Sequence, residues 1–406
     1  MRSNAITYHA CQDFKMNFID IIYLIVASQG FLLAILLTMK KGSGIYLPLI
    51  VFLFLISIDF TFQFLYSSKV ILNYPHLIYI NVPLNMLKGV LVFMYVRNIY
   101  YGKPTYFLRD LLFFIPFLLY FLHYCDFYLY DSKNKVNEFS SYLNQGIFML
   151  ENLAEWALEI FVTLPFVGAS IHLLNQFDFK VRNEFSDLTY YNFSLARKFL
   201  VGVIIIYGFE IITIILAYFG FPFAGATNAV TYLVCGILLY LVGYDALIRQ
   251  DFIEASYQPS IWKPDNNVGT EDVISEAQTM LKYKHNVIPE IQSEAIIKQL
   301  CHCMDFDKLY RNPEIRLTAL SKILDESPNN VSQIINQKFN QNFYDFINSY
   351  RVKEASAMLV SSKYQHLTIE SVGYDVGFKS KSTFYTAFKK FTHLTPVEYK
   401  NKNYHN

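Results

Sequence analysis

Seven apolar stretches between residues 17 and 249 are the feature that most constrains how this chain can fold. Most of them approach the ~20 residues that an α-helix needs to cross the ~30 Å hydrocarbon core of a bilayer. Their regular succession, with short polar loops between them, favours membrane spans over buried helices of a large soluble core. The stretches are Phe18–Met39, Ile45–Tyr66, Leu77–Val96, Phe107–Tyr124, Ile147–Leu174, Phe199–Phe219 and Ala226–Ile248.

The overall composition agrees with a membrane domain. Hydrophobic residues make up 53% of the chain and aromatic residues 17%, and the mean hydropathy is +0.26. These values are high for a soluble globular protein. Because the excess is concentrated before residue 250, we expect a seven-helix transmembrane domain over residues 17–249. No cleavable signal peptide is recognised, and residues 1–16 are expected to be an N-terminal extension, with Met16 directly before the first span.

Loop charge predicts the orientation of these spans. If the C-terminal end lies in the cytoplasm, seven spans place the N-terminus outside, and the inner loops then carry nine Lys or Arg against five in the outer segments. This asymmetry follows the positive-inside rule, so we expect a multi-pass protein in the cytoplasmic membrane of a bacterium. The inner residues are Lys40, Lys41, Arg97, Lys103, Arg109, Lys180, Arg182, Arg197 and Lys198, and the outer ones are Arg2, Lys15, Lys69, Lys133 and Lys135.

Several charged side chains lie inside the apolar stretches, where charge is costly and commonly functional. Glu151, Glu155 and Glu159 recur every fourth residue and so share one helix face. Counted at 1.5 Å per residue, Lys88 and Glu210 lie at a similar depth to Glu159. Three interpretations remain open: ion pairs that lock the bundle, a pocket for a small cationic or polar ligand, and a proton or ion pathway. The residues expected at this polar site are Lys88, Glu155, Glu159, Glu210 and Asp59.

An acidic linker over residues 250–309 is predicted to follow the spans. From Arg249 to Tyr310 the chain has six Lys or Arg and ten Asp or Glu. Ser256–Thr270 is typical of a flexible tether because proline and glycine interrupt it. Helices are expected over Glu271–Tyr283, with Thr270 as its N-cap, and over Glu290–Leu309. The second helix has an apolar face that comprises Ile297, Leu300 and Met304. This face predicts packing either on the following domain or in a dimer.

The sequence contains no pattern of catalytic residues. No nucleotide-binding loop or kinase signature occurs, and the spans hold no His and Asp cluster with metal-ligand spacing. We therefore expect neither an enzyme nor a cofactor or metal. Isolated apolar cysteines are commonly packing residues, and the five present are Cys11, Cys125, Cys235, Cys301 and Cys303.

The segment from Arg311 to Asn406 is basic, with thirteen Lys or Arg and eight Asp or Glu. Such a surplus suits DNA phosphates. A short helix over 316–325 is followed by Ser327-Pro328, an N-cap with proline at the first helical position. The next helix exposes amides and hydroxyls, and Asn and Gln can pair bidentately with adenine. These exposed residues are Asn329, Asn330, Ser332, Gln333 and Asn336.

A second unit repeats this plan after a long helix over Phe343–Leu359. Thr368 is expected to cap a helix over Ile369–Val376, and Gly377-Phe378 forms the turn. Ser380 then caps a helix over 381–391. The outward-facing residues of this last helix are Lys381, Ser382, Tyr385, Thr386 and Lys389.

Four runs in this region carry a specific pattern. They are Ile347–Val352, Val376–Phe384, Phe388–Phe391 and Leu394–Tyr399. With them, the segment 310–400 resembles the DNA-binding domain of AraC-type (AraC/XylS) transcription regulators. The resemblance implies that the second helix of each unit enters one of two successive major grooves. It assigns base contacts to Asn329, Ser332, Gln333, Lys381, Ser382, Tyr385 and Thr386.

The sequence departs from the AraC-type pattern at two positions. Gly373 stands where a small helix former such as Ala is usual, and His393 replaces the usual Gly before Leu394. Neither change removes a residue expected to contact a base. Because Gly is a poor helix former, we expect the helix that holds Gly373 to be softened.

The complete fold prediction is all-α: a seven-helix transmembrane bundle, an acidic helical linker and, over residues 310–406, an AraC-type domain with two helix-turn-helix units. This order resembles that of multi-span, membrane-anchored regulators. The leading hypothesis is a membrane-embedded, sequence-specific regulator that couples an unknown signal to promoter binding. The alternative is a membrane transporter or channel with a C-terminal regulatory domain. The expected partners are double-stranded DNA, the lipid bilayer, a second copy of the chain and an unidentified small-molecule signal.

Overall fold

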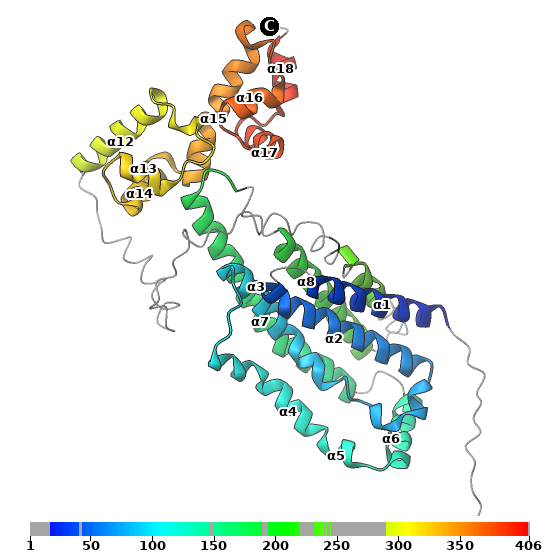
Figure 1. Ribbon diagram of the computed structural model, residues 1–406. Coiled ribbons are helices and arrows are strands. Elements are labelled where there is room, and N and C mark those ends of the chain that lie inside the picture. Colours follow the sequence, from blue (N-terminus) through cyan, green and yellow to red (C-terminus); the bar gives the residue numbers. More distant parts are fainter. Residues whose placement is uncertain are drawn as a thin grey trace, which may run out of the picture. The chain divides into compact units, whose positions relative to one another are not determined.

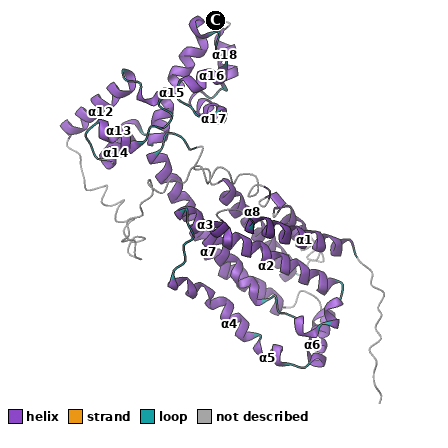
Figure 2. Cartoon of the chain, in the orientation of Figure 1, coloured by secondary structure: helices purple, strands orange, loops and turns teal. Residues whose placement is uncertain are grey.

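A computed structural model describes residues 17–39, 43–145, 150–188, 194–219, 230–238, 240–241, 244 and 290–404. These residues form helices, turns and loops, and the described part contains no β-strand (Figures 1 and 2). The chain divides into two units, one of residues 1–174 with 193–251 and the other of residues 175–192 with 252–406. The all-helical part of the fold prediction is therefore confirmed.

The helices of the first unit form a bundle, in which α1 and α2 pack against each other more extensively than any other pair (Figure 1). A Cβ added to Gly30 of α1 would overlap the Ser57 side chain of α2, so these helices approach closely where both residues are small. The helices are α1 (Phe18–Thr38), α2 (Ser43–Ser67), α3 (Lys88–Tyr101), α4 (Ile115–His123), α5 (Cys125–Leu129), α6 (Ser132–Gln145), α7 (Leu150–Glu184) and α8 (Ser194–Tyr218). Residues 230–238 are also helical.

Four helices among the described residues are long and apolar enough to cross a membrane. They cover Phe18–Thr38, Gly44–Ser67, Ala154–Glu184 and Ala196–Leu216. The prediction of seven spans is thus met only in part. Of the remaining three expected stretches, the seventh lies partly outside the described residues.

The third and fourth expected spans are broken rather than continuous helices. The 3₁₀ turn η3 (Pro83–Leu87) precedes α3, and η4 (Leu108–Phe114) precedes α4. Proline lies at the start of η3 and again in the first turn of α4. Because proline removes a backbone donor and clashes with the preceding turn, it favours a new helix start at these points. A count of apolar residues does not detect such breaks.

Arg97 of α3, expected as an inner loop charge, is instead a buried structural residue. Its Nη1 and Nη2 donate to the two carboxylate oxygens of Asp110 at 2.8 and 2.6 Å. Nη2 also donates to the Thr105 carbonyl at 2.7 Å. This bidentate geometry is a strong form of ion pair, and it fixes the loop that joins α3 to η4.

In the second unit, helices pack on both sides of the long helix α15 (Phe343–Val360) (Figure 1). One core joins α15 to α12, α13 and α14, and the other joins it to α16, α17 and α18. The helices are α12 (Glu290–Asp305), α13 (Leu317–Ile323), α14 (Pro328–Phe339), α16 (Ile369–Asp375), α17 (Lys381–Thr392) and α18 (Pro396–Tyr404), with the 3₁₀ turns η5 (Leu309–Arg311) and η6 (Ser362–Tyr364).

The three N-caps predicted after residue 310 are present, and the fourth, at Thr270, lies outside the described residues. The hydroxyl oxygens of Ser327, Thr368 and Ser380 accept hydrogen bonds from the backbone N–H groups three residues later, at 3.1, 3.1 and 3.2 Å. Each bond satisfies one of the donors that a helix start leaves free. These caps therefore fix the first residues of α14, α16 and α17.

The α12 helix packs within its own unit. Leu300 and Met304 are fully buried in the core shared with α13 to α15. This agrees with packing on the following domain, one of the two interpretations left open for this helix. The third residue of the predicted apolar face, Ile297, is only partly buried, whereas its neighbour Ile296 is buried. The helix ends at Asp305, four residues before its predicted end. The tether, the helix expected over residues 271–283 and the N-terminal extension lie outside the described residues.

Candidate nucleic-acid interface

The α14 helix presents polar side chains opposite a buried apolar face. Asn329 and Asn336 are exposed, and Ser332 and Gln333 are partly exposed. Asn330 differs from these, because its Nδ2 donates to the Glu326 carboxylate at 2.9 Å and its N–H takes part in the Ser327 cap. The side chain of Asn330 therefore stabilises the turn before α14. Val331, Ile334 and Ile335 are the buried residues that hold the helix on the core.

The α17 helix presents the second set of predicted contacts. Lys381, Ser382, Thr386 and Lys389 are exposed, and Tyr385 is half-buried. The Lys381 Nζ lies 5.4 Å from the centre of the Tyr385 ring and 2.5 Å from a Glu370 carboxylate oxygen. Exposed ion pairs of this kind contribute little to stability, so this pair can open at small cost.

Arg351 of α15 is a buried centre of hydrogen bonds, with 1% of its surface exposed. Nε donates to the Tyr310 carbonyl at 2.7 Å, and Nη2 donates to the Asn312 carbonyl at 2.9 Å. Nη1 donates to the Asn348 amide oxygen at 3.1 Å and to the Ser186 carbonyl at 3.2 Å. Burial lowers the pKa of Arg351 to about 10, which leaves it charged at neutral pH. Its role is structural.

The end of α7 and residues 185–188 also belong to this second unit. Phe185 forms an isolated antiparallel bridge with Arg316. The buried Ser186 hydroxyl donates to the Ile315 carbonyl at 2.8 Å, and Arg351 Nη2 donates to the same hydroxyl at 3.3 Å. Residues that directly continue an apolar helix are therefore part of the core that supports α13 and α15.

Glu354 of α15 accepts hydrogen bonds from three residues at the same junction. Its carboxylate accepts hydrogen bonds from Lys308 Nζ at 2.6 Å, from Arg311 Nη2 at 2.6 Å and from the Tyr310 hydroxyl at 3.0 Å. Burial raises the pKa of Glu354, but these bonds outweigh it and hold the pKa to about 2. No pattern in the sequence indicates this cluster, since Glu354 lies more than 40 residues after its partners.

This depressed pKa predicts how the second unit responds to acid. Because the folded pKa of Glu354 is about 2 and the ordinary value is 4.5, its stabilisation is complete above about pH 4.5 and is lost as the pH falls towards 2. We expect Glu354→Gln to lower the free energy of unfolding at pH 7 by about 2–3 kcal/mol and to flatten its fall between pH 4.5 and 2.

Hydrogen exchange of the α15 amides in the full-length protein measures this effect. Asp375→Asn, at an exposed carboxylate of α16, is the matched control and should leave the pH dependence unchanged. An unaltered pH profile in Glu354→Gln would contradict the assignment.

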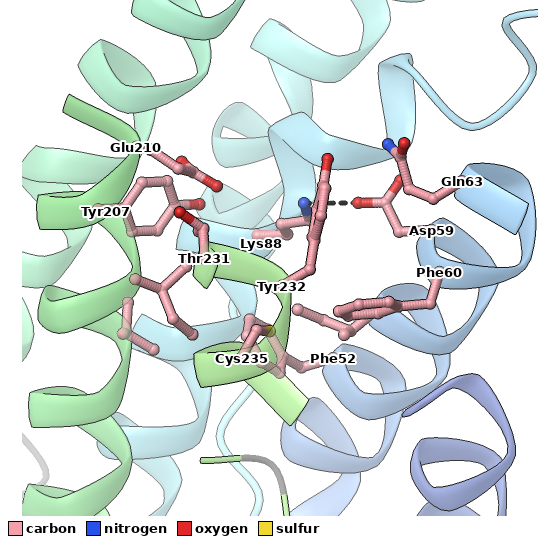
Figure 3. A pocket seen from close by; sticks show the side chains of 13 residues that line it. Phe52, Asp59, Phe60, Gln63, Lys88, Tyr207, Glu210, Thr231, Tyr232 and Cys235 are labelled. Atoms are coloured by element: carbon pink, nitrogen blue, oxygen red, sulfur yellow. Dashed lines mark hydrogen bonds and ion pairs between the residues drawn. The ribbon is translucent and has the colours of Figure 1, made fainter. Parts of the chain in front are cut away.

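The structure brings together four of the five residues expected at the polar site in the apolar helices. Lys88 Nζ lies 2.8 Å from Asp59 Oδ2 and 3.3 Å from Glu159 Oε1. Glu210 lines the same cavity (Figure 3). Glu155 lies elsewhere and accepts a hydrogen bond from the Tyr124 hydroxyl at 2.5 Å. The prediction placed Glu155 there because it shares a helix face with Glu159, but a neighbouring tyrosine takes its carboxylate.

Sequence reasoning missed Tyr207 and Tyr232 at this cavity. Tyrosine is common throughout the chain, with 32 copies, so the sequence contains no signal that singles out these two. Across the described residues, no group of three or more His, Cys, Asp or Glu is arranged to hold a metal ion. Cys303 is buried in the core beside α15, as a packing residue.

Comparison with known proteins identifies the C-terminal domain. The family described as "Helix-turn-helix domain" matches residues 320–402. Uncharacterised HTH-type transcriptional regulators of Staphylococcus aureus strains COL and MSSA476 are each 29% identical over 104 residues. The match covers 26% of this chain and only 13% of the length of each relative.

A solved structure of a protein of unknown function from Listeria innocua is also similar. It is 22% identical, covers 26% of this chain and 96% of its own, and has a TM-score of 0.24, which is too low to bear on the fold. The relatives named as regulators, the family match and the two capped units agree. Residues 320–402 therefore form an AraC-type helix-turn-helix domain, the DNA-binding domain of a transcriptional regulator.

Proposed function

We propose that the whole chain is a membrane-embedded transcription regulator. In this proposal, α14 and α17 bind a specific promoter sequence, and a signal received among the apolar helices controls that binding. The observation that carries the proposal is the continuity of α7. This helix runs unbroken from Leu150 to Glu184, and its last ten residues already belong to the unit that holds both DNA-binding helices.

The polar faces of α14 and α17 support sequence-specific binding. In the AraC-type arrangement, each helix enters one of two successive major grooves. Gln333 and Lys381 are suited to base edges, since Gln pairs bidentately with adenine and Lys with guanine. The basic surplus of the domain supplies the attraction to phosphate, and the caps at Ser327 and Ser380 hold the two helix starts.

The contacts of residues 182–188 support a direct route from the membrane to DNA. The Arg182 guanidinium lies 5.6 Å from the Tyr344 ring, and Ser186 is hydrogen-bonded to both Arg351 and Ile315. A signal that stabilises one arrangement of α7 over another acts on these contacts, and such coupling requires unequal binding to the two states. We propose α7 as the transmitting element, in addition to the linker over residues 250–309.

The four long apolar helices support residence in a membrane. We propose that the complete membrane domain has seven spans, with the two interrupted stretches at α3 and α4 among them. The C-terminal domain then lies in the cytoplasm, where the chromosome is. A second copy of the chain would double the DNA footprint, and we propose the protein as a homodimer on this ground.

One observation favours a second function, that of a transporter or channel. Interrupted helices near the middle of a bilayer are typical of transporters, and Lys88 of the polar site begins α3 directly after the 3₁₀ turn η3. In this alternative the DNA-binding domain reports transport rather than signal binding.

Genome-wide DNA occupancy of the full-length protein in its own cells separates these functions. We expect discrete promoter peaks that disappear in Gln333→Ala, Lys381→Ala. Each lost base contact costs about 1–3 kcal/mol, so the affinity for the promoter should fall at least about 30-fold. The double variant Lys363→Ala, Gln365→Ala removes the same residue types from an exposed turn and should keep every peak.

An absence of peaks in the unaltered protein under all growth conditions would favour the transporter. Cell fractionation that recovers the full-length protein outside the membrane would refute membrane embedding.

A further inference from the structure

We propose that the cavity beside Lys88 binds a small organic ammonium ion. The cavity lies in the first unit among α2, α3, α8 and the helical residues 230–238 (Figure 3). The inference rests on the proposed function only where it identifies this ligand as the signal. The binding itself is argued from the charges, the walls and the volume of the cavity.

The charges around the cavity do not balance. Lys88 is the positive group, and it pairs with both Asp59 and Glu159. Glu210 is a third carboxylic acid and has no hydrogen-bond or ion-pair partner among the residues that the structure describes. Figure 3 shows the Glu210 and Asp59 carboxyl groups on opposite sides of Lys88. Unpaired charge in apolar surroundings is costly, so a cation beside Glu210 would restore the balance.

The two paired carboxylates are also held by neutral donors. Asn81 Nδ2 donates to Asp59 at 2.9 Å, and the Tyr207 hydroxyl donates to Glu159 at 3.3 Å. These bonds fix both acids on the Lys88 side of the cavity. Glu210 therefore remains as the carboxylate available to a ligand.

Aromatic rings form part of the cavity wall. Phe52, Phe60, Tyr207 and Tyr232 line it, and the Tyr232 ring is held edge-on against Phe60, with the ring centres 5.6 Å apart. Aromatic faces attract ammonium ions, most strongly where water is excluded. A divalent metal ion is not favoured here, because the described residues hold no group of three or more His, Cys, Asp or Glu arranged to bind one.

The volume limits the size of the ligand. The cavity has about 50 Å³ of free space, which holds on the order of four water-sized groups. Pockets for drug-sized ligands begin at about 300 Å³. The geometry therefore points to an ammonium with one to four carbon atoms, such as methylammonium or tetramethylammonium.

Thermal unfolding of the full-length protein in lipid nanodiscs tests this inference. Methyl-, dimethyl- and tetramethylammonium chloride serve as probes, against equal concentrations of sodium chloride. We expect at least one amine to raise Tm saturably, by about 5 °C at a hundredfold excess over its Kd. Glu210→Gln should raise that Kd at least about tenfold, whereas Glu138→Gln, at an exposed carboxylate of α6, should not change it.

The Tyr232 pair gives an independent readout. Tyr232→Phe keeps the ring and should bind like the unaltered protein, whereas Tyr232→Leu should bind at least about tenfold more weakly. If Glu210→Gln does not fold, the comparison of Tyr232→Phe with Tyr232→Leu tests the inference without it. The inference is overturned if no amine gives a saturable shift, or if Glu210→Gln and Tyr232→Leu both bind as well as the unaltered protein. In that case Glu210 is simply protonated. The assay contains no DNA, so either result leaves the proposed promoter binding to its own test.

Discussion

Replacing Arg351 with methionine is expected to lower the free energy of unfolding of the second unit by about 3–5 kcal/mol. Methionine keeps an unbranched apolar stem like that of arginine, but it is shorter and donates no hydrogen bond. The carbonyl groups of Tyr310, Asn312 and Ser186 would lose the donors they now have at 2.7, 2.9 and 3.2 Å. Each unsatisfied buried polar group costs about 1–3 kcal/mol, and the removal of a buried charge offsets only part of this loss.

Hydrogen exchange of the α15 amides in the full-length protein measures the Arg351 effect. Lys353→Met is the matched control, because Lys353 is an exposed cation two residues along the same helix, and it should change the exchange rates little. Arg351→Lys should be intermediate, since it keeps the charge but not the planar fork of donors. A loss below about 1 kcal/mol in Arg351→Met would show that Arg351 does not join the segments as described.

The same measurement tests whether α7 and the DNA-binding domain form one cooperative unit. Segments that unfold together exchange with a common free energy. If Ser186 is part of the core, the amides of residues 185–188 should lose protection together with those of α15 when Arg351 is replaced. Unchanged protection of residues 185–188 would mean that the end of α7 is held independently, which would weaken the proposed route from membrane to DNA.

Local signals explain why much of the second unit could be predicted from the sequence. A cap such as Ser327 followed by proline sets a helix start through atoms within three residues, and the structure has these bonds where the sequence placed them. Arg351 is different, because one of its partners, Ser186, is 165 residues away, and no pattern in the sequence links them.

Gly373 has a packing role that helix propensity does not predict. The sequence indicated a softened helix, because Gly is a poorer helix former than Ala by about 1 kcal/mol. In the structure a Cβ at this position would lie 2.7 Å from the ring of Phe384. Glycine therefore allows α16 and α17 to approach, and this close contact compensates for its low propensity.

The polar site of the first unit was predictable only in part for a related reason. Depth along each span placed Lys88, Glu159 and Glu210 at one level, and the structure joins the first two directly. Rotation about each helix axis is set by packing, which the sequence does not give. Glu155 shares a helix face with Glu159, but it bonds to Tyr124 instead of joining the site. The sequence also does not indicate which aromatic side chains line the cavity.

Gly377→Ala is expected to destabilise the second unit by about 3–5 kcal/mol. Gly377 has a φ of +102° in the turn between α16 and α17, a region where a Cβ costs about 1–2 kcal/mol. That Cβ would also lie 2.6 Å from the Arg311 carbonyl oxygen and 2.7 Å from that of Tyr310. Overpacking of this kind costs about 1–3 kcal/mol more, since backbone atoms cannot move aside as the end of a flexible side chain can.

Gly377→Ala should also interact with Arg351→Met, because both changes act on the Tyr310 carbonyl. That oxygen accepts the Arg351 Nε hydrogen bond and faces the Gly377 Cα. Once Arg351 is gone, the backbone at Tyr310 is freer to yield to a new Cβ, so the double variant should lose less than the sum of the single losses by about 1 kcal/mol or more. Strictly additive losses in hydrogen exchange would mean that the two residues support the turn separately. A loss in the double variant that is smaller than the sum of the single losses would show that Arg351 supports both the turn of the second helix-turn-helix unit and the end of α7.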